Sequence, residues 1–460
     1  MSDEFEDALK AVLSREVEGF QSLQSSQQLT AGASQETYRL TLNTQSGEQR
    51  LALRRSQPTL AADSGVGSIS LVTEARLFQL AGSNGIPGPE IVYILQPEDG
   101  LGAGFIMQWL EGETLGQRIN RAEEFAGVRP VLARDCGRIL GRIHALDWRA
   151  AELETALPNV HPAALVDETW DIYRQLKVPV PMIDYTWRWL QDNVPAHSRI
   201  GLVHGDFRNG NLMVTPTGIN AVLDWELAQI GDPVRDLGWL CVNSWRFGNS
   251  ELPVGGFGQI DELLAGYHET SGVEVSREQL EYWQVFGSFW WAIVTLQMAN
   301  GWRTGETPSL ERPVIGRRSS EAQMDCVNLL IPGDFVLPDV KRPIAAGTQL
   351  PMPAELLEGV VKFLKEDIAG QLDPHSKFLA KVAANSLQIA QREFLCGDSL
   401  RAQEKMRLEA LLGQQGDLDG LRQELVNRLR DGLPLNTPGL TDHLRQSVAG
   451  QLAIDQPRYL

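Results

Sequence analysis

The sequence is poor in basic side chains relative to acidic ones. Of its 460 residues, 41 are Lys or Arg and 59 are Asp or Glu, which gives a net charge of −18 at neutral pH. A chain this acidic lacks the overall electrostatic attraction that draws proteins to nucleic acid or to an anionic membrane surface. We therefore expect neither nucleic acid nor a membrane as its partner.

Cysteines and long apolar runs are also scarce. The four cysteines are scattered and form no CxxC or Cys/His cluster, which argues against a zinc site and a disulfide framework. The longest apolar stretch, 286–299, is interrupted by polar residues and is shorter than the roughly 20 residues that a membrane span needs, so we expect a buried helix there. The acidic N-terminus has no signal-peptide pattern. These features predict a cytoplasmic protein.

Tryptophan, charge and proline divide the chain. All 12 tryptophans precede residue 303, and residues 1–350 carry a net charge of −16 against −2 for residues 351–460. Five prolines between residues 331 and 353 disfavour a regular helix or central strand there. The predicted domains are a β-rich lobe over 1–110, a mostly helical lobe over 111–330, a linker over 331–353 and a helical bundle over 354–460.

Hydrophobic periodicity gives the expected elements. Alternating residues predict a hairpin from Thr37–Leu42 and Gln49–Arg54, followed by a helix over Ile69–Leu80 and strands at IVYIL and GFIMQWL. Beyond Gly112 the chain is mostly helical, which makes the fold class α+β. After the linker, apolar residues recur at helical spacing, and their stripes are expected to form the core of the bundle; the helix-like runs are 356–368, 377–394, 399–412, 418–430 and 438–453.

The segment 202–240 contains the groups that phosphoryl transfer requires. Asp206 and Asn211 lie five residues apart on a loop between apolar pairs, and Asp224 ends another apolar run thirteen residues later. One carboxylate can orient the attacking hydroxyl, while an amide oxygen and a second carboxylate can hold Mg²⁺. We therefore expect Asp206 to be catalytic and Asn211 and Asp224 to be metal ligands.

The strings HGDFRNGN and LDWE resemble the catalytic-loop and metal-binding motifs of the aminoglycoside phosphotransferase family, a branch of the protein-kinase-like fold. The resemblance implies a two-lobed fold with ATP and Mg²⁺ as cofactors, followed here by an all-α domain. His204, Asp232 and Asp236 also match family positions, but we expect structural roles for them. His204 would hold the loop in shape, and Asp236 could cap a helix beginning at Leu237.

A kinase-like small lobe needs a cation on its third strand, usually a lysine. Residues 1–350 contain only three lysines, none on a candidate strand. Because alternate strand residues share a face, Ala52 and Arg54 should face the nucleotide and Arg55 should point away. Glu74 is the expected partner of Arg54. The alternatives are a solvent-exposed arginine and an ordinary surface carboxylate.

Two further segments resemble nucleotide-binding parts of the family. LTAGASQETYRL resembles the loop that covers the phosphates, with Gly32 and Ser34 near the nucleotide, although it also fits a plain turn. GFIMQWLEGETL resembles the hinge between the lobes. There, backbone groups from Gln108 to Leu110 would bind the adenine edge and Met107 would line the pocket, unless this is simply a strand leaving the lobe.

The acceptor site of the family lies on helices that correspond here to about 161–195 and 240–305. Glu226, Trp245 and Arg303 are the candidate acceptor residues, against a core role for the aromatic residues and a solvated arginine. The layout resembles the branch of kinase domains fused to acyl-CoA dehydrogenases, which implies a hydroxy acid or hydroxyacyl-CoA rather than an aminoglycoside or amino alcohol. The tail, with NTPGLTDHL, resembles an uncharacterised helical domain of unknown role.

These observations predict an ATP- and Mg²⁺-dependent kinase that phosphorylates the alcohol group of a small molecule. A protein kinase is disfavoured because no Ser or Thr lies between Asp224 and Asp236. A different alternative is a catalytically inactive scaffold whose C-terminal bundle binds a protein partner; the retained Asp206, Asn211 and Asp224 oppose it. The oligomeric state and the choice between ATP and GTP stay open.

Overall fold

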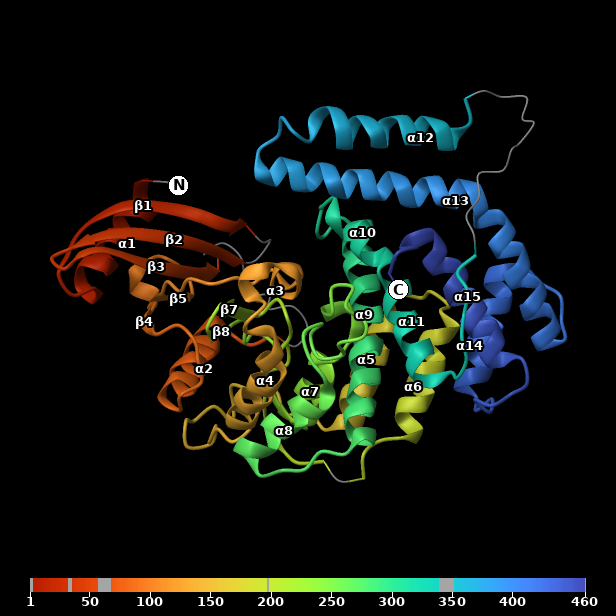
Figure 1. The fold of residues 1–460 in the computed structure, drawn as a ribbon, viewed down its shortest axis with the longest axis horizontal. Coiled ribbons are helices and arrows are strands. Elements are labelled where there is room, and N and C mark those ends of the chain that lie inside the picture. The colour runs from red at the N-terminus through yellow and green to blue at the C-terminus, as the bar shows by residue number, and fades with distance from the viewer. Residues whose placement is uncertain (1–2, 32–34, 57–67, 197, 339–350, 460) are drawn as a thin grey trace. The chain divides into compact units, whose positions relative to one another are not determined.

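The computed structural model divides the chain into two compact units. One comprises Met1–Pro162 and Ala196–Trp283, and the other comprises Ala163–Pro195 and Gln284–Leu460. The residues that the structure describes are 3–31, 35–56, 68–196, 198–338 and 351–459. Figure 1 shows the elements of both units along the chain.

The first unit begins with helix α1 (Asp3–Glu16) and an antiparallel sheet of five strands in the order β1-β2-β3-β5-β4. The predicted hairpin is confirmed and is longer than expected, with Thr44 opposite Gly47 at the turn. The short helix η1 (Pro97–Asp99) follows β4. The strands are β1 (Phe20–Ala31), β2 (Gln35–Thr44), β3 (Gly47–Ser56), β4 (Ile91–Ile94) and β5 (Gly104–Gln108).

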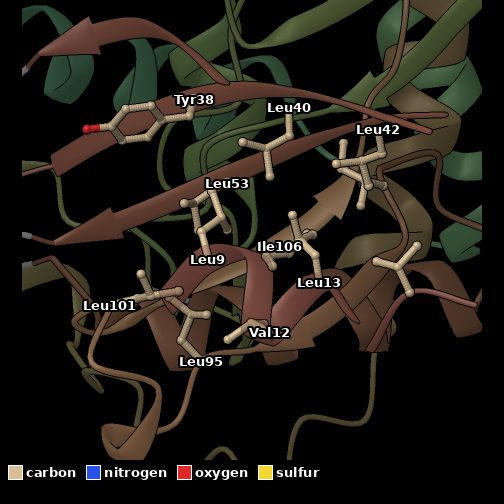
Figure 2. Packing of buried hydrophobic residues seen from close by; sticks show 12 residues of the cluster. Leu9, Val12, Leu13, Tyr38, Leu40, Leu42, Leu53, Leu95, Leu101 and Ile106 are labelled. Atoms are coloured by element: carbon tan, nitrogen blue, oxygen red, sulfur yellow. The ribbon is translucent and has the colours of Figure 1, made fainter. Parts of the chain in front are cut away.

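Helix α1, to which the sequence analysis assigned no element, covers one face of this sheet. Its apolar residues recur at positions three and four apart, so Leu9, Val12 and Leu13 share one side of the helix. Figure 2 shows them directed at the inward-facing side chains of the strands, among them Leu40 and Leu53. This packing makes a closed hydrophobic core on the side of the sheet that carries Arg55.

Helix α2 (Leu71–Ser83) packs on the other face of the sheet, the one opposite to α1. It begins at Ser70, whose hydroxyl accepts the Thr73 backbone N–H at 3.1 Å as an N-cap. Phe78 of α2 meets Phe105 of β5 with ring centres 6.1 Å apart. Because Phe105 lies opposite Arg54 in the sheet register, α2 is held on the face that presents Arg54.

The rest of the first unit is mostly helical and carries two small antiparallel sheets of two strands each, β6 with β9 and β7 with β8. Helices α4 and α8 approach so closely that a Cβ on Gly137 would lie 2.1 Å from the Leu263 carbonyl oxygen. The elements are α3 (Gly116–Arg121), η2 (Glu123–Phe125), α4 (Arg129–Ile143), β6 (Gly201–Val203), β7 (Leu212–Thr215), β8 (Gly218–Val222), β9 (Gln229–Gly231), α7 (Val234–Leu240), η3 (Asn243–Trp245), α8 (Ile260–Ser271) and the start of α9 (Arg277–Thr304).

The second unit is all helical and joins segments from both sides of the predicted linker. Asp184 of α6 is fully buried and accepts hydrogen bonds from Tyr173 of α5 at 2.9 Å and from Arg430 of α14 at 2.7 Å. The units therefore follow a different division from the predicted domains. The helices are α5 (Pro162–Gln175), α6 (Pro181–Asp192), the end of α9, α10 (Glu311–Arg317), α11 (Ser319–Leu330), α12 (Pro353–Lys362), η4 (Phe363–Ile368), α13 (Pro374–Leu412), α14 (Leu418–Arg430) and α15 (Leu440–Asp455).

Two expectations for the tail are wrong. The runs 377–394 and 399–412 form one helix, α13, which continues through Gly397 and lies beside α12 (Figure 1). The apolar stripe of α12 is not all core, because Leu356 and Val360 are 59% and 48% exposed while Val361 is buried. The predicted buried helix at 286–299 is part of α9, and no helix in the described ranges has the length and hydropathy needed to cross a membrane.

Candidate active site

The loop between β6 and β7 holds the Asp206 carboxylate in a fixed orientation. Oδ1 accepts hydrogen bonds from Trp239 Nε1 at 2.8 Å and Arg208 Nε at 3.0 Å, and Oδ2 accepts from Asn211 Nδ2 at 2.5 Å. The residue is only 8% exposed. Burial raises the pKa of Asp206, although Arg208 opposes the shift. A buried, oriented carboxylate with a raised pKa is suited to accept the proton of a substrate hydroxyl.

A second carboxylate, Asp236 on α7, holds the backbone of this loop. Its oxygens accept from the N–H groups of His204 at 2.7 Å and Gly205 at 2.9 Å, and His144 Nε2 lies 3.1 Å away. Burial alone would raise the pKa of Asp236, but the His144 contact and the other hydrogen bonds leave it lower than usual. Helix α7 begins at Val234 rather than at Leu237, so the predicted capping role of Asp236 is wrong. Its role is to clamp the loop.

His204 and Asp232 lie in the structural surroundings of the site. The Asp206 backbone N–H donates to His204 Nδ1 at 3.2 Å, and burial lowers the pKa of His204 to about 4, so the ring is neutral at pH 7. Asp232 accepts from the Val234 N–H at 3.0 Å and from Trp283 Nε1 at 3.1 Å. Both residues thus organise their own chain segments.

The two expected metal ligands come from the β7–β8 hairpin. The Leu223 N–H donates to the Asn211 carbonyl oxygen at 2.9 Å, which places Asn211 next to the residue preceding Asp224. Asp224 follows β8 in a left-handed conformation with φ of +67°. The Asn211 side-chain NH₂ is used on Asp206, so its Oδ1 is the end of the amide left to contact a cation.

Arg54 connects the small lobe to this hairpin. Its guanidinium contacts Glu74 at 3.2 Å, Asp224 at 3.0 Å and Glu226 at 3.5 Å. The structure thus brings together the residues that sequence reasoning paired, Arg54 and Glu74, and adds two more carboxylates. Arg55 points to the other face, where it pairs with Glu36 at 2.7 Å.

Burial raises the pKa of two carboxylates that contact Arg54, those of Glu74 and Glu226. Glu74 is 1% exposed, and burial raises its pKa to about 7 even though Arg54 opposes the shift. Burial also raises the pKa of Glu226, with repulsion from Asp224 acting in the same direction. Perturbed titrating groups gathered around one cation are typical of functional sites.

Some backbone groups of the predicted adenine-binding segment, Gln108 to Leu110, already form hydrogen bonds within the lobe. Ala52 lies opposite Met107 in the register, so both side chains share the Arg54 face. The Gln108 N–H donates to Glu90 O at 2.8 Å, and the following N–H, of Trp109, donates to a β3 carbonyl. Among the described residues no backbone–backbone hydrogen bond uses the Leu110 N–H, so of these three N–H groups it is the one left for the predicted adenine contact. Gly32 and Ser34 lie outside the described residues.

The three expected acceptor residues do not belong to one compact unit, because Glu226 and Trp245 lie in the first and Arg303 lies in the second. Trp245 is buried in the first unit, where the Arg208 guanidinium lies 4.4 Å from the centre of its ring, so it reaches the catalytic loop through Arg208. Glu226 faces Arg54. Arg303 belongs to the second unit and is exposed.

Sequence reasoning missed three residues of the site. Arg208 lies inside the HGDFRNGN string, two residues after Asp206, so the sequence could have predicted that it lies near that carboxylate. Gln35 Oε1 accepts a hydrogen bond from Arg54 Nη2 at 2.9 Å. Gln35 lies on the neighbouring strand opposite Ser56, which is two residues from Arg54, and this pairing was only weakly predictable from the hairpin pattern. Trp239 lies 33 residues beyond Asp206 and is buried among other aromatic residues, so only the fold reveals its hydrogen bond.

Asn211 and Asp224 fit a magnesium ion by their chemistry. Both present hard oxygen donors, which Mg²⁺ prefers, and Mg²⁺ usually keeps several waters and binds through one or two protein ligands. Within the described ranges no three His, Cys, Asp or Glu side chains gather into a metal site. A cation here would therefore complete its shell with water and phosphate oxygens.

An antiparallel lobe with a partly buried cation and a helical lobe with a carboxylate-bearing loop define a protein-kinase-like phosphotransferase fold. Residues 25–273, more than half of the chain, match the phosphotransferase enzyme family, and the protein belongs to that family. Residues 370–459 match a domain of unknown function, DUF6285.

Known relatives agree with this assignment. The chain is 27% identical over 224 residues to acyl-CoA dehydrogenase family member 10 of Mus musculus, covering 47% of this chain and 20% of that protein. It is 26% identical over 357 residues to family member 11 of Pongo abelii, covering 71% of this chain and 42% of that protein. The chain thus spans less than half the length of these relatives.

A solved structure confirms the fold class predicted from the sequence. The crystal structure of a Ralstonia eutropha protein assigned to the aminoglycoside phosphotransferases superposes with a TM-score of 0.56 at 20% identity, covering 70% of this chain and 97% of that one. The two-lobed α+β fold followed by a helical region is therefore as expected.

Proposed function

We propose that the protein transfers the γ-phosphate of ATP to an alcohol group of a small molecule, with Mg²⁺ as cofactor. The observation that carries this proposal is the contact network joining Arg54 to Glu74 and Asp224, next to a catalytic loop in which Asn211 binds Asp206. Positioning and charge stabilisation are what phosphoryl transfer requires from a protein.

Each residue has a separate task in this proposal. Asp206 orients the acceptor hydroxyl and takes its proton, and Arg54 binds phosphate oxygens through its planar guanidinium. Asn211 and Asp224 would hold Mg²⁺, which neutralises charge on the transferring phosphate. Glu74 keeps Arg54 in place, and Asp236 keeps the loop in place through its two backbone hydrogen bonds.

We further propose that the acceptor is a hydroxy acid or hydroxyacyl-CoA rather than an aminoglycoside or amino alcohol. Arg208 lies beside Asp206 at 3.0 Å and is partly exposed, so the acceptor side of the loop carries a cation. A cation there attracts an acidic acceptor and repels a polycationic one. The similarity to proteins named for acyl-CoA dehydrogenases supports the same class.

An ADP-release assay tests the proposal. ATP and Mg²⁺ are supplied with hydroxy acids, hydroxyacyl-CoAs, aminoglycosides or amino alcohols in turn, and Asp224→Ala is the control. We expect acceptor-dependent ADP release with an acidic acceptor and none in the variant. Release with aminoglycosides alone would overturn the acceptor class, and the same release in Asp224→Ala would overturn the assigned site.

A further inference from the structure

The second unit contains a cavity that shares no residue with the catalytic site. Its volume is about 440 Å³, within the range of small-molecule pockets. It is lined from several helices, for example by Met182 of α6, Leu296 of α9, Ser320 of α11 and Ser447 of α15. Part of its wall comes from residues 370–459, which match the domain of unknown function.

Four arginines line the cavity, and three of them are neutralised by carboxylates. The four are Arg317, Arg401, Arg407 and Arg422. The ion pairs are Arg422 with Glu404 at 2.6 Å, Arg401 with Asp398 at 2.8 Å and Arg317 with Asp455 at 3.1 Å. Three cationic side chains of the wall therefore already have anionic partners within the protein.

Arg407 differs from the other three arginines. Among the described residues no carboxylate lies within ion-pair distance of it, and its Nη2 donates only to the hydroxyl of Ser447 at 3.2 Å. Its Nε–H is buried and has no acceptor in the described part of the chain. A buried donor without an acceptor destabilises the folded protein, and more so when the group is charged.

His443 is the second unsatisfied group. It is 3% exposed, and neither ring nitrogen has a hydrogen-bond partner among the described residues. It lies four residues before Ser447 on α15, so the two side chains share one face of that helix. Burial lowers the pKa of His443 to about 4, so at pH 7 the ring is neutral and one nitrogen carries a proton to donate. Arg407, Ser447 and His443 all line the cavity.

We propose that this cavity binds a small molecule through an oxyanion group, a phosphate or a carboxylate, held by Arg407 and His443. An oxyanion has several acceptor lone pairs for the two unpaired N–H groups, and its charge complements Arg407, which forms no ion pair among the described residues and is acted on only at longer range by Glu404, the partner of Arg422. Apolar side chains of the wall, including Leu296 and Leu444, suit the rest of the ligand.

Calorimetric titration of the full chain with inorganic phosphate and, separately, with acetate tests this site at constant ionic strength. Arg407→Met is compared with Lys405→Met, which makes the same charge change on the same helix at a side chain that pairs with Glu409 outside the cavity. We expect saturable binding that is at least about tenfold weaker in Arg407→Met and unchanged in Lys405→Met. It should persist in Arg54→Met, which removes the phosphate-binding cation of the first unit.

His443→Leu provides a second readout. Because it deletes two unpaired polar atoms, its unfolding temperature without anion should be equal to or higher than that of the natural chain, while the rise on adding anion should be lost. The relative response to phosphate and acetate identifies the oxyanion. Absence of binding by both anions, or equal affinities of Arg407→Met and Lys405→Met, would overturn the proposal.

Discussion

Nη2 of Arg54 lies 3.0 Å from Oδ1 of Asp224, although 170 residues separate them in the chain. One belongs to the β3 strand of the small lobe and the other follows β8 of the helical lobe. The same guanidinium also contacts Glu74. The expected phosphate-binding cation therefore lies between its helix partner, Glu74, and an expected metal ligand, Asp224. Arginine keeps its charge throughout the working pH range, so this link does not depend on its protonation.

Arg54→Met should weaken nucleotide binding about 10- to 100-fold, because it removes charged hydrogen bonds worth about 1.5–3 kcal/mol. Arg55→Met is the matched control, since the neighbouring arginine pairs with Glu36 on the opposite face of the sheet. Fluorescence titration with an ATP analogue measures both. A larger loss in Arg55→Met would show that the nucleotide approaches the other face.

The pH dependence of nucleotide binding should report Glu74. Its raised pKa of about 7 means that the carboxylate is charged above that pH and protonated below it. The Arg54–Glu74 ion pair therefore forms as the pH rises from 6 to 8, and affinity should increase over this window. In Glu74→Gln this part of the increase should vanish.

The phosphate groups of the nucleotide also titrate in this pH range, but they affect the natural chain and Glu74→Gln equally, so their effect cancels when the two pH profiles are compared. Glu36→Gln, which alters the partner of Arg55 instead, should keep the dependence of the natural chain. Identical pH profiles for the natural chain and Glu74→Gln would contradict the role of Glu74.

Asp206→Asn should lower turnover by about 10²–10⁴-fold while ATP binding stays nearly unchanged, because the amide cannot accept the hydroxyl proton. Asp232→Asn replaces another buried carboxylate of the same unit, one that binds Val234 and Trp283. It should reduce stability more than turnover. Steady-state kinetics with the identified acceptor, together with a binding measurement, separates the two effects.

Gly205→Ala should destabilise the first unit by several kcal/mol. Gly205 has φ of +85°, and a Cβ there would lie 2.1 Å from the Leu227 carbonyl oxygen. Left-handed backbone costs about 1–2 kcal/mol for other residues, and the overlap adds about 1–3 kcal/mol. Gly85→Ala has a similar φ of +70° but open space, so urea unfolding of the pair isolates the overlap. Equal losses would mean that the loop yields to the added methyl group.

The sequence predicted elements and residue types that depend on local pattern. The hairpin and the strand face of Arg54 followed from alternation, whereas the resemblance to a kinase-like lobe, together with the scarcity of lysine, singled out Arg54 and implied Glu74 as its helix partner. The Trp239 hydrogen bond to Asp206 did not, because it joins residues distant in sequence through buried packing. Likewise, a helical apolar stripe at Leu356 and Val360 shows which side chains share a face but not whether anything covers them.

The division of the helical regions was also beyond local patterns. A proline-rich segment marks where regular structure stops, but it does not tell which helices pack together. The buried Asp184, satisfied by Tyr173 and Arg430, ties a helix from before the catalytic loop to one in the tail. Such a pairing depends on three-dimensional charge matching between segments that are about 250 residues apart in the chain.

The Asp236 clamp has a consequence for how the family can diversify. Because one side chain fixes the backbone at His204 and Gly205, the neighbouring Asp206, the proposed proton acceptor, keeps its place while the side chains around it vary. Under the proposed function, acceptor recognition can then change through Arg208, and through Trp245 beneath it, without moving the loop backbone. The loop backbone that Asp236 holds can therefore stay the same among related proteins while the side chains next to it differ.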